Sequence, residues 1–178
     1  MDKNKQDINT FLIELKDGNL DSLAKVYLLS KKQVFAVCLG ILKDRGLAED
    51  AMQTTFVRIQ EKIDYYNENT NGLAWVLTIA RNISLNEVKK NARVTTTDFA
   101  ENEYLTKTDD KQFDDMPIFK IAKDILSEEE LEIVMLYVVS GYKHREIAEI
   151  VQKPLGTVLW SYNNSIKKLQ KVLKNKEV

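Results

Sequence analysis

Apolar residues recur every three or four positions through almost all of the 178-residue chain, and this spacing constrains the fold more than any other feature. It predicts helices over residues 6–17, 20–42, 47–64, 72–91, 118–126, 128–139, 143–150 and 155–174. No run of alternating apolar and polar residues bounded by turn signals competes as a strand. The sequence therefore predicts an all-α protein.

Residues 94–117 interrupt the helical spacing. This stretch is rich in threonine, ends at Pro117 and carries seven acidic and two basic side chains, a net charge of −5. It is longer than an ordinary connection within a compact domain. We therefore expect two small helical domains, residues 1–93 and 118–178, joined by an acidic linker over residues 94–117.

The second half contains signals for the ends of its helices. Ser127 followed by Glu130 is typical of a capping box at a helix start. Pro154 stands just ahead of the last helix, and the helix before it is short. A short helix, a turn and a longer helix form a helix-turn-helix layout, the arrangement of many DNA-binding domains.

The composition argues against most enzyme chemistry. One histidine, one cysteine and six scattered glycines leave no metal cage, disulfide or phosphate-binding loop, so we expect no cofactor, no metal and no catalytic activity. No stretch of 18 apolar residues is present, so we expect no membrane insertion and a cytoplasmic protein. Cys38 lies in an apolar run, which favours a core residue over a redox switch.

The last predicted helix has an unusual polar face. With Tyr162 at the centre of the buried stripe, Leu155, Val158, Ile166, Leu169 and Leu173 fall beside it. The opposite face then carries Thr157, Trp160, Asn164, Lys167, Lys168 and Lys171. Residues 142–178 have a net charge of +5. The face suits a recognition helix in DNA, although an amphipathic helix with one exposed tryptophan would look the same.

The helix over residues 72–91 and the loop before it suit single-stranded nucleic acid. Thr78, Arg81 and Lys89 lie opposite the apolar face, with Asn82 alongside. The preceding loop contains Tyr65, Tyr66, Asn67 and Asn69. Aromatic rings stack on unpaired bases and amides bond to their edges. An ordinary solvated helix face and polar loop is the alternative.

Four segments together point to a known family. They are Ala48–Ile59, Ala74–Asn82, Glu146–Ile150, and Gly156–Val158 with Ile166–Leu169. In their order and spacing the chain resembles bacterial RNA polymerase sigma factors of the extracytoplasmic-function type. The resemblance implies two helical domains, conventionally called sigma domains two and four, that bind core RNA polymerase and give it promoter specificity. It also implies an anti-sigma factor as a partner.

The resemblance assigns roles to individual residues. It places Asp50 and Gln53 against core polymerase, and we expect neighbouring Phe56 in the core. Reading of the minus-ten promoter DNA is expected of Tyr65, Tyr66, Asn67, Asn69, Thr78, Arg81, Asn82 and Lys89. Binding of the minus-thirty-five promoter DNA is expected of Thr157, Trp160, Ser161, Asn164, Lys167 and Lys168, with His144 and Arg145 at the DNA backbone. Trp75 is expected to pack within the protein.

The chain also departs from the family pattern. Leu159, Ser161 and Asn164 stand where a basic residue is common, so duplex binding by the C-terminal domain alone should be weak. Gln152 stands where glycine is usual, which costs about 1 kcal/mol if the turn needs positive φ.

Two other interpretations stay open at this point. One is a stand-alone helix-turn-helix regulator whose N-terminal bundle is a sensor or dimerisation domain. The other is a helical adaptor that binds only protein through the surface around Trp160. A gel shift with and without core polymerase distinguishes all three.

Overall fold

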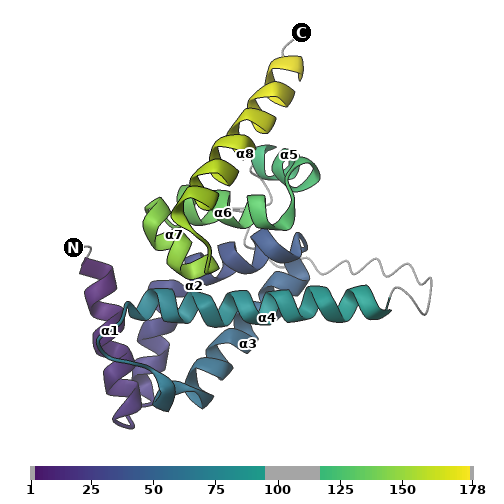
Figure 1. The fold of residues 1–178 in the computed structure, drawn as a ribbon. Helices are drawn as coiled ribbons and strands as arrows, with labels where there is room; N and C mark the ends of the chain where they lie inside the picture. The colour runs from purple at the N-terminus through teal and green to yellow at the C-terminus, as the bar shows by residue number, and fades with distance from the viewer. Residues whose placement is uncertain (1–2, 95–116, 177–178) are drawn as a thin grey trace.

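A computed structural model describes residues 3–94 and 117–176, and within these ranges the chain is helical with no strand. The elements are α1 (Lys3–Lys16), α2 (Asp21–Leu42), α3 (Arg45–Glu61), the short 3₁₀ helix η1 (Ile63–Tyr65), α4 (Gly72–Val94), α5 (Pro117–Ile125), α6 (Glu128–Val138), α7 (His144–Val151) and α8 (Leu155–Lys176). Figure 1 shows their arrangement. The all-α prediction is confirmed.

The predicted helix bounds lie within three residues of the observed ones, and two of the differences are informative. α3 ends at Glu61 rather than residue 64, because the backbone tightens at Lys62, whose N–H reaches the carbonyls of both Arg58 and Ile59. α4 continues to Val94, the first residue of the expected linker. The rest of that linker up to residue 116 lies outside the described residues, so the division into two domains stays a prediction.

In the N-terminal half, α2 is the central helix. It packs against α1, α3 and α4, and the apolar residues of its inner face, such as Val34 and Val37, are fully buried. Cys38 lies in the same core. Burial raises the pKa of its thiol to about 11, so the thiolate that reacts with oxidants is scarce at neutral pH. The expected role of Cys38 as a core residue is confirmed.

In the C-terminal half, α6 is the central helix and contacts α5, α7 and α8. Its start carries the predicted capping box between Ser127 and Glu130. α7 and α8 form the predicted helix-turn-helix. The turn between them holds Gln152 at φ 56°, the left-handed conformation that favours glycine. The departure noted in the sequence therefore falls on a position that does need positive φ.

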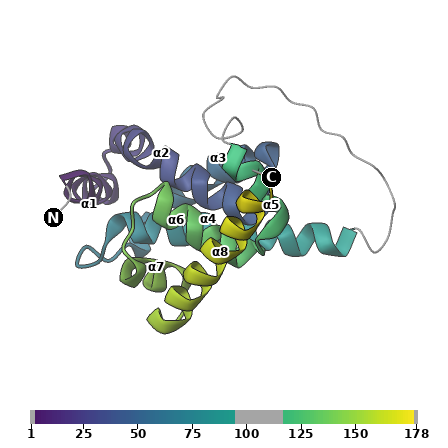
Figure 2. The same ribbon diagram turned by 90° about the horizontal axis from the view of Figure 1, so that it is seen from above.

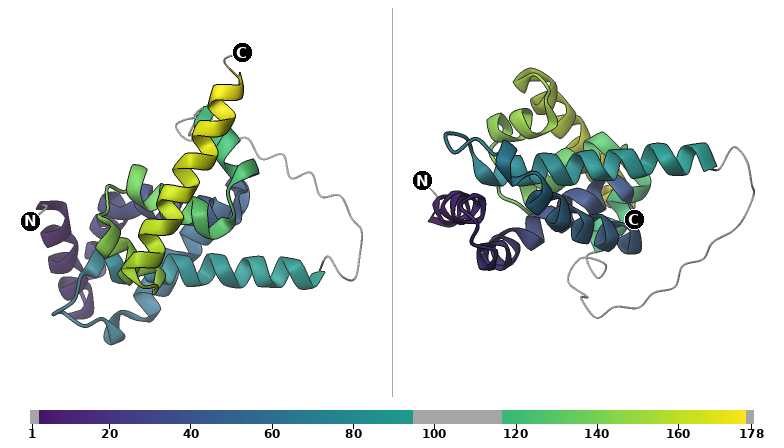
Figure 3. Two further views of the ribbon diagram at one scale, coloured as in Figure 1. Left: turned by 45° about the horizontal axis from the view of Figure 1, so that its top comes forward. Right: turned by 90° about the horizontal axis from the view of Figure 1, so that it is seen from below.

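The two halves pack directly against each other. α6 lies on α2, and α7 lies on α4 (Figures 1 and 2). The C-terminal turns of both α4 and α8 extend beyond the packed body (Figure 3). α4 begins directly after the polar loop, and its face that contacts α7 thus lies next to the C-terminal helices.

Gln152 offers a direct test of this turn. Gln152→Gly should stabilise the chain by up to about 1 kcal/mol, because glycine adopts the left-handed conformation without steric cost. Gly141 has φ 67° with nothing near its missing side chain, so Gly141→Ala should destabilise by a similar amount. Urea denaturation measures both, and a loss of stability in Gln152→Gly would contradict the assignment.

Candidate nucleic-acid and polymerase interfaces

The expected polymerase-binding residues lie on one exposed stretch of α3. Asp50 and Gln53 are both exposed. Phe56, one turn further along, is buried, and its ring meets the edge of the Tyr27 ring at 4.9 Å. The expectation that Phe56 belongs to the core is therefore confirmed, while Asp50 and Gln53 present a carboxylate and an amide to solvent.

Of the two tyrosines in the loop before α4, one is exposed and the other is buried. Tyr65 is 81% exposed, but Tyr66 is 1% exposed. The Tyr66 ring packs on Trp75 at 5.2 Å, and its hydroxyl donates to the Thr70 carbonyl. Burial raises the pKa of Tyr66. In this structure Tyr66 is not available to read DNA, because its ring fills the space beneath the loop. Trp75 packs within the protein, as expected.

Residues of α1 hold this loop in place, a role that the sequence did not suggest. The Asn9 side chain accepts from the N–H of Gly72 at 2.8 Å and donates to the carbonyl of Thr70 at 3.2 Å. Lys16 donates to the Tyr66 carbonyl at 3.1 Å. These contacts join residues 50 or more positions apart, so no local pattern could have shown them. They fix the loop that carries the exposed amides.

The remaining loop and α4 residues differ in how accessible they are. Asn67, Asn69, Asn82 and Lys89 are exposed. The Asn67 Oδ1 accepts from the Asn69 N–H at 3.0 Å, which shapes the turn. Thr78 is half-buried, and its hydroxyl donates to the Ala74 carbonyl at 2.8 Å. The accessible polar groups thus follow the loop and the outer side of α4.

Arg81 does not lie on the open surface that the sequence suggested. Its Nε donates to Oε1 of Glu132 on α6 at 2.8 Å. The side chains are 15% and 2% exposed respectively. In this conformation Arg81 is therefore not available to contact DNA, because Glu132 of the C-terminal half binds its guanidinium. Burial raises the pKa of Glu132 to about 7, and the Arg81 charge opposes part of that rise.

The face of α8 that packs on the protein is rotated from the predicted one. Its buried stripe consists of Val158, Ser161, Ser165 and Leu169, with Tyr162 at the edge. Because serine is small, these two residues let α8 pack close to its neighbours. The Ser165 hydroxyl donates to the Ser161 carbonyl at 2.8 Å. Periodicity counts serine as polar and therefore misplaced the stripe. Ser161 is 4% exposed, so it does not lie on the accessible face where the sequence analysis placed it for DNA contact.

Asn164 and Lys168 also turn inward, toward Glu130 of the capping box. The Asn164 amide donates to Glu130 Oε1 at 3.0 Å, and the Lys168 ammonium lies 2.7 and 2.8 Å from the two carboxylate oxygens. Burial alone would raise the pKa of Glu130, but these donors and the Ser127 N–H hold it below its ordinary value. The predicted solvent-facing, DNA-binding roles of Asn164 and Lys168 are not supported, because both side chains join α8 to α6.

His144 lies in an aromatic cluster at the start of α7. Its ring stacks on Tyr137 at 4.7 Å and meets Tyr162 at 4.8 Å, and its buried Nε2 has no hydrogen-bond partner within the described chain. The His144 ring is thus packed between Tyr137 and Tyr162, and its expected contact with the DNA backbone stays a prediction. Arg145 beside it is exposed, in agreement with the expectation.

The outer face of α8 is the part that remains accessible. Thr157, Trp160 and Lys167 are exposed as predicted, and Trp160 is 68% exposed. At 100° per residue, the true buried stripe places Asn163 near the middle of the opposite face, and Asn163 is exposed. The sequence analysis missed Asn163 because it assigned the neighbouring asparagine to this face.

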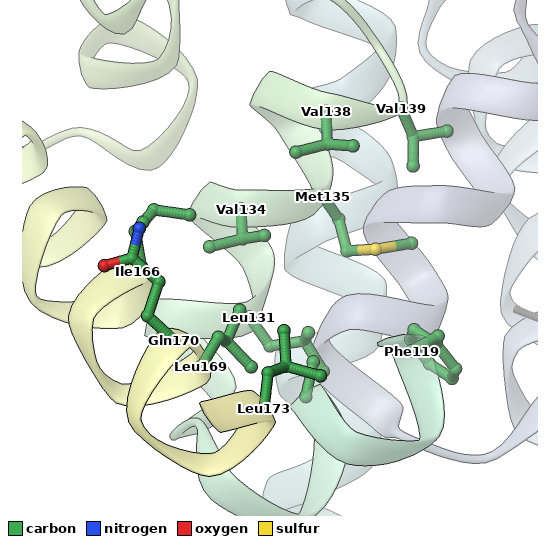
Figure 4. Close-up of a pocket in the computed structure, with 11 residues that line it drawn as sticks. Phe119, Leu131, Val134, Met135, Val138, Val139, Ile166, Leu169, Gln170 and Leu173 are labelled. Atoms are coloured by element: carbon green, nitrogen blue, oxygen red, sulfur yellow. The ribbon is translucent and has the colours of Figure 1, made fainter. Parts of the chain in front are cut away.

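An apolar groove of about 240 Å³ lies between α5, α6 and α8. Figure 4 shows side chains of all three helices around it. They include Phe119, Leu131, Val134, Met135, Leu169 and Leu173. Val138 at its rim is 61% exposed. The groove can accept an apolar side chain from outside the chain.

The described part of the chain holds neither a candidate metal site nor a helix that could span a membrane. No group of three or more histidine, cysteine, aspartate or glutamate side chains gathers there in a way that could hold a metal ion. Among the helices described, none is long and apolar enough to cross a membrane.

Comparison with known protein families gives a match over the N-terminal half. Residues 26–94 match the model of sigma-70 region 2. The segment includes α3, the polar loop and α4, which together carry the expected polymerase and minus-ten residues.

Curated relatives extend the similarity to the C-terminal half. The chain is 28% identical to the ECF RNA polymerase sigma factor EcfG of Rhodopseudomonas palustris over 148 residues, which cover 79% of this chain and 78% of the relative. It is 20% identical to the ECF RNA polymerase sigma factor SigK of a Mycobacterium species over 178 residues, covering 94% and 91%.

Solved structures share the fold. The sigma factor RpoE of Bartonella quintana, solved in complex with the anti-sigma factor NepR, gives a TM-score of 0.72 at 24% identity and covers 87% of this chain and 98% of that one. CnrH, solved with the cytosolic domain of CnrY, gives 0.71 at 14% identity, covering 95% and 98%.

The burial of Glu132 predicts a pH dependence of stability, because it raises the pKa of the carboxyl more than the Arg81 charge lowers it. The folded pKa of Glu132, about 7, lies above its ordinary value near 4.5. The contribution of Glu132 to the free energy of unfolding is therefore fully present below about pH 4.5 and is lost as the pH rises through about 7. Between pH 5 and 8 the parent should lose up to about 3 kcal/mol relative to Glu132→Gln. Denaturant unfolding at each pH measures this, with Glu128→Gln on the exposed side of α6 as the control. Parallel pH curves for parent and Glu132→Gln would contradict it.

Proposed function

Because the chain belongs to the extracytoplasmic-function sigma factors, we propose that it binds core RNA polymerase and directs it to a specific set of promoters. The observation that carries this proposal is the region 2 match over residues 26–94, which joins the exposed Asp50 and Gln53 to the polar loop and α4 in one segment. We propose that it acts in the cytoplasm as a specificity subunit with no reaction of its own.

We propose a division of labour between residues 1–93 and 118–178. The first unit reads unpaired minus-ten bases through the exposed side chains of Tyr65, Asn67, Asn69 and Asn82, since rings stack and amides bond once strands separate. The second places the outer face of α8 in the major groove of the minus-thirty-five element. A gel shift with and without core polymerase separates this function from a stand-alone regulator, which would bind duplex DNA without the polymerase.

The polymerase interface is tested by a double substitution on α3. Asp50→Lys with Gln53→Ala should reduce co-purification with core polymerase at least tenfold, because charge reversal removes complementarity and adds repulsion. Both side chains are exposed, so the helical circular dichroism should be unchanged. Asp17→Lys, an exposed charge reversal after α1, is the control. Unchanged co-purification of the double variant would exclude this surface as the polymerase site.

Two neighbouring asparagines test which face of α8 reads DNA. Asn163→Ala should shift the sequence selected from a randomised minus-thirty-five library, since an exposed amide can pair with a base edge, and should change stability by less than about 0.5 kcal/mol. Asn164→Ala should leave the selected sequence unchanged and destabilise by about 1–2 kcal/mol, because it loses a bond to the Glu130 carboxylate.

The selection is run with core polymerase present, and stability is measured by urea denaturation. A shifted sequence preference in Asn164→Ala with none in Asn163→Ala would show that the face rotates on binding DNA, against this proposal.

We further propose that an anti-sigma protein inhibits the chain, as the structurally similar RpoE was solved with the anti-sigma factor NepR. The apolar groove between α5, α6 and α8 supplies a surface for an apolar side chain of that partner. Val138→Asp at the exposed rim should weaken the partner's binding at least tenfold and leave core polymerase binding intact. Co-purification from the source cells, followed by competition with core polymerase, measures both. Equal capture of the partner by parent and Val138→Asp would exclude the groove.

A further inference from the structure

Helix α1 lies outside the segment that matches sigma-70 region 2, which starts at residue 26. It nevertheless contacts η1 and α4, the elements on either side of the polar loop over residues 66–71 (Figure 1). Two of its side chains, Asn9 and Lys16, form hydrogen bonds with this loop and with the first residue of α4. A loop inside the matched segment is therefore held by residues outside it.

Asn9 holds the end of the loop that leads into α4. Its Oδ1 accepts from the N–H of Gly72, the first residue of α4, and its Nδ2 donates to the Thr70 carbonyl. The first N–H groups of a helix have no partner within that helix. Asn71 supplies a local acceptor for the Ala74 N–H at 3.3 Å, and Asn9 supplies one for Gly72 from a different helix.

Gly72 leaves the space that Asn9 occupies. A Cβ on Gly72 would lie 2.6 Å from the Asn9 Oδ1 and 2.7 Å from the Leu12 Cδ1. It would also lie 3.0 Å from the Tyr66 hydroxyl oxygen. The backbone of Gly72 does not have positive φ, so the close approach of α1, and not the backbone conformation, calls for glycine here. A larger residue would displace the Asn9 side chain or move α1 away from the loop.

Lys16 holds the other end of the loop. Its ammonium donates to the Tyr66 carbonyl at 3.1 Å and to the Glu68 Oε1 at 3.3 Å. Asn67 and Asn69, two of the exposed amides that we expect to meet unpaired bases, lie between the Lys16 bond at residue 66 and the Asn9 bond at residue 70. The two anchors thus bracket the accessible amides.

The anchors act mainly on the backbone of the loop. Their bonds to Tyr66, Thr70 and Gly72 all involve main-chain groups, so they form whichever side chains the loop presents. A loop that must become ordered on binding loses conformational freedom at that step, which lowers affinity unless the loop is ordered beforehand. Asn9 and Lys16, both half-buried, order this loop in advance.

We propose that Asn9 and Lys16 are positioning residues for reading of the minus-ten element. They hold residues 66–72 in the conformation that presents the Asn67 and Asn69 amides to unpaired bases, and so they set how strictly those bases are discriminated. This inference rests on the proposed function. Without the anchors the amides would still reach the bases, but in several conformations with different hydrogen bonds, so base discrimination would fall while polymerase binding persists.

The test compares Asn9→Ala and Lys16→Met with a control on the same helix. Glu14→Gln is the matched control, because Glu14 accepts from Ser22 and Lys25 and so joins α1 to α2 rather than to the loop. Holoenzyme assembled from core polymerase and each full-length variant selects from duplex promoters with a randomised minus-ten element. The ratio of the preferred base to the next should fall by about fivefold or more in both loop variants and stay within about twofold of the parent in the control.

Two conservative variants cover a failure of the first pair to fold. Lys16→Arg keeps donors for the Tyr66 carbonyl and should retain the parental base preference. Asn9→Asp keeps the acceptor for the Gly72 N–H but loses the donor to Thr70, so it should show a partial loss of preference. All variants should bind core polymerase as the parent does, since the expected polymerase-binding residues lie on α3.

Backbone hydrogen exchange of the free chain measures the anchoring independently of DNA. The Gly72 amide should exchange about tenfold faster or more in Asn9→Ala than in the parent or Glu14→Gln. If the parental holoenzyme shows no minus-ten preference, the proposed function fails and the positioning role with it, while hydrogen exchange still decides the anchoring. Parental base preference in both loop variants, or an equal loss of preference in Glu14→Gln, would overturn the positioning role alone.

Discussion

The buried pair between Arg81 and Glu132 is the interaction on which the arrangement of the two halves depends. A carboxylate that is 2% exposed needs a compensating charge, and the guanidinium that supplies it comes from the other half of the chain. The pair therefore ties the position of α6 to the face of α4. Gly40 and Lys43 act around it, one by leaving space and the other by binding the backbone carbonyls ahead of α6.

Glu130 has the corresponding role within the C-terminal half. Its carboxylate is held by the capping box and receives both Asn164 and Lys168 from α8. Two glutamates two positions apart thus have different structural roles because of their partners: Glu132 faces the N-terminal half, and Glu130 faces α8. Their pKa values are displaced in opposite directions for the same reason, since Glu130 has several donors and Glu132 is more deeply buried beside one.

Much of the fold could be predicted from the sequence, and the errors have a common physical origin. Helix positions follow from apolar spacing, and the Ser127 capping box and the core position of Phe56 are local features. The orientation of α8 was wrong because Ser161 and Ser165 are small as well as polar, and their size decides how close helices come. Arg81, Asn164 and Lys168 found partners far away in the chain, and the spacing within one helix carries no information about such contacts. Tyr66 packs beneath its own loop against Trp75, which the loop sequence did not distinguish from the exposed Tyr65.

The hydrogen bonds that Asn164 and Lys168 of α8 donate to Glu130 fix the rotation of that helix about its own axis. The outer residues Thr157, Trp160, Asn163 and Lys167 make no contribution to that anchoring in the described contacts, so they are free to vary without loosening the fold. On the proposed function, a lineage could acquire new promoter preferences by substitutions on the outer face alone, with the inner face conserving the geometry. The same separation would let engineered variants recognise different promoters while keeping one scaffold.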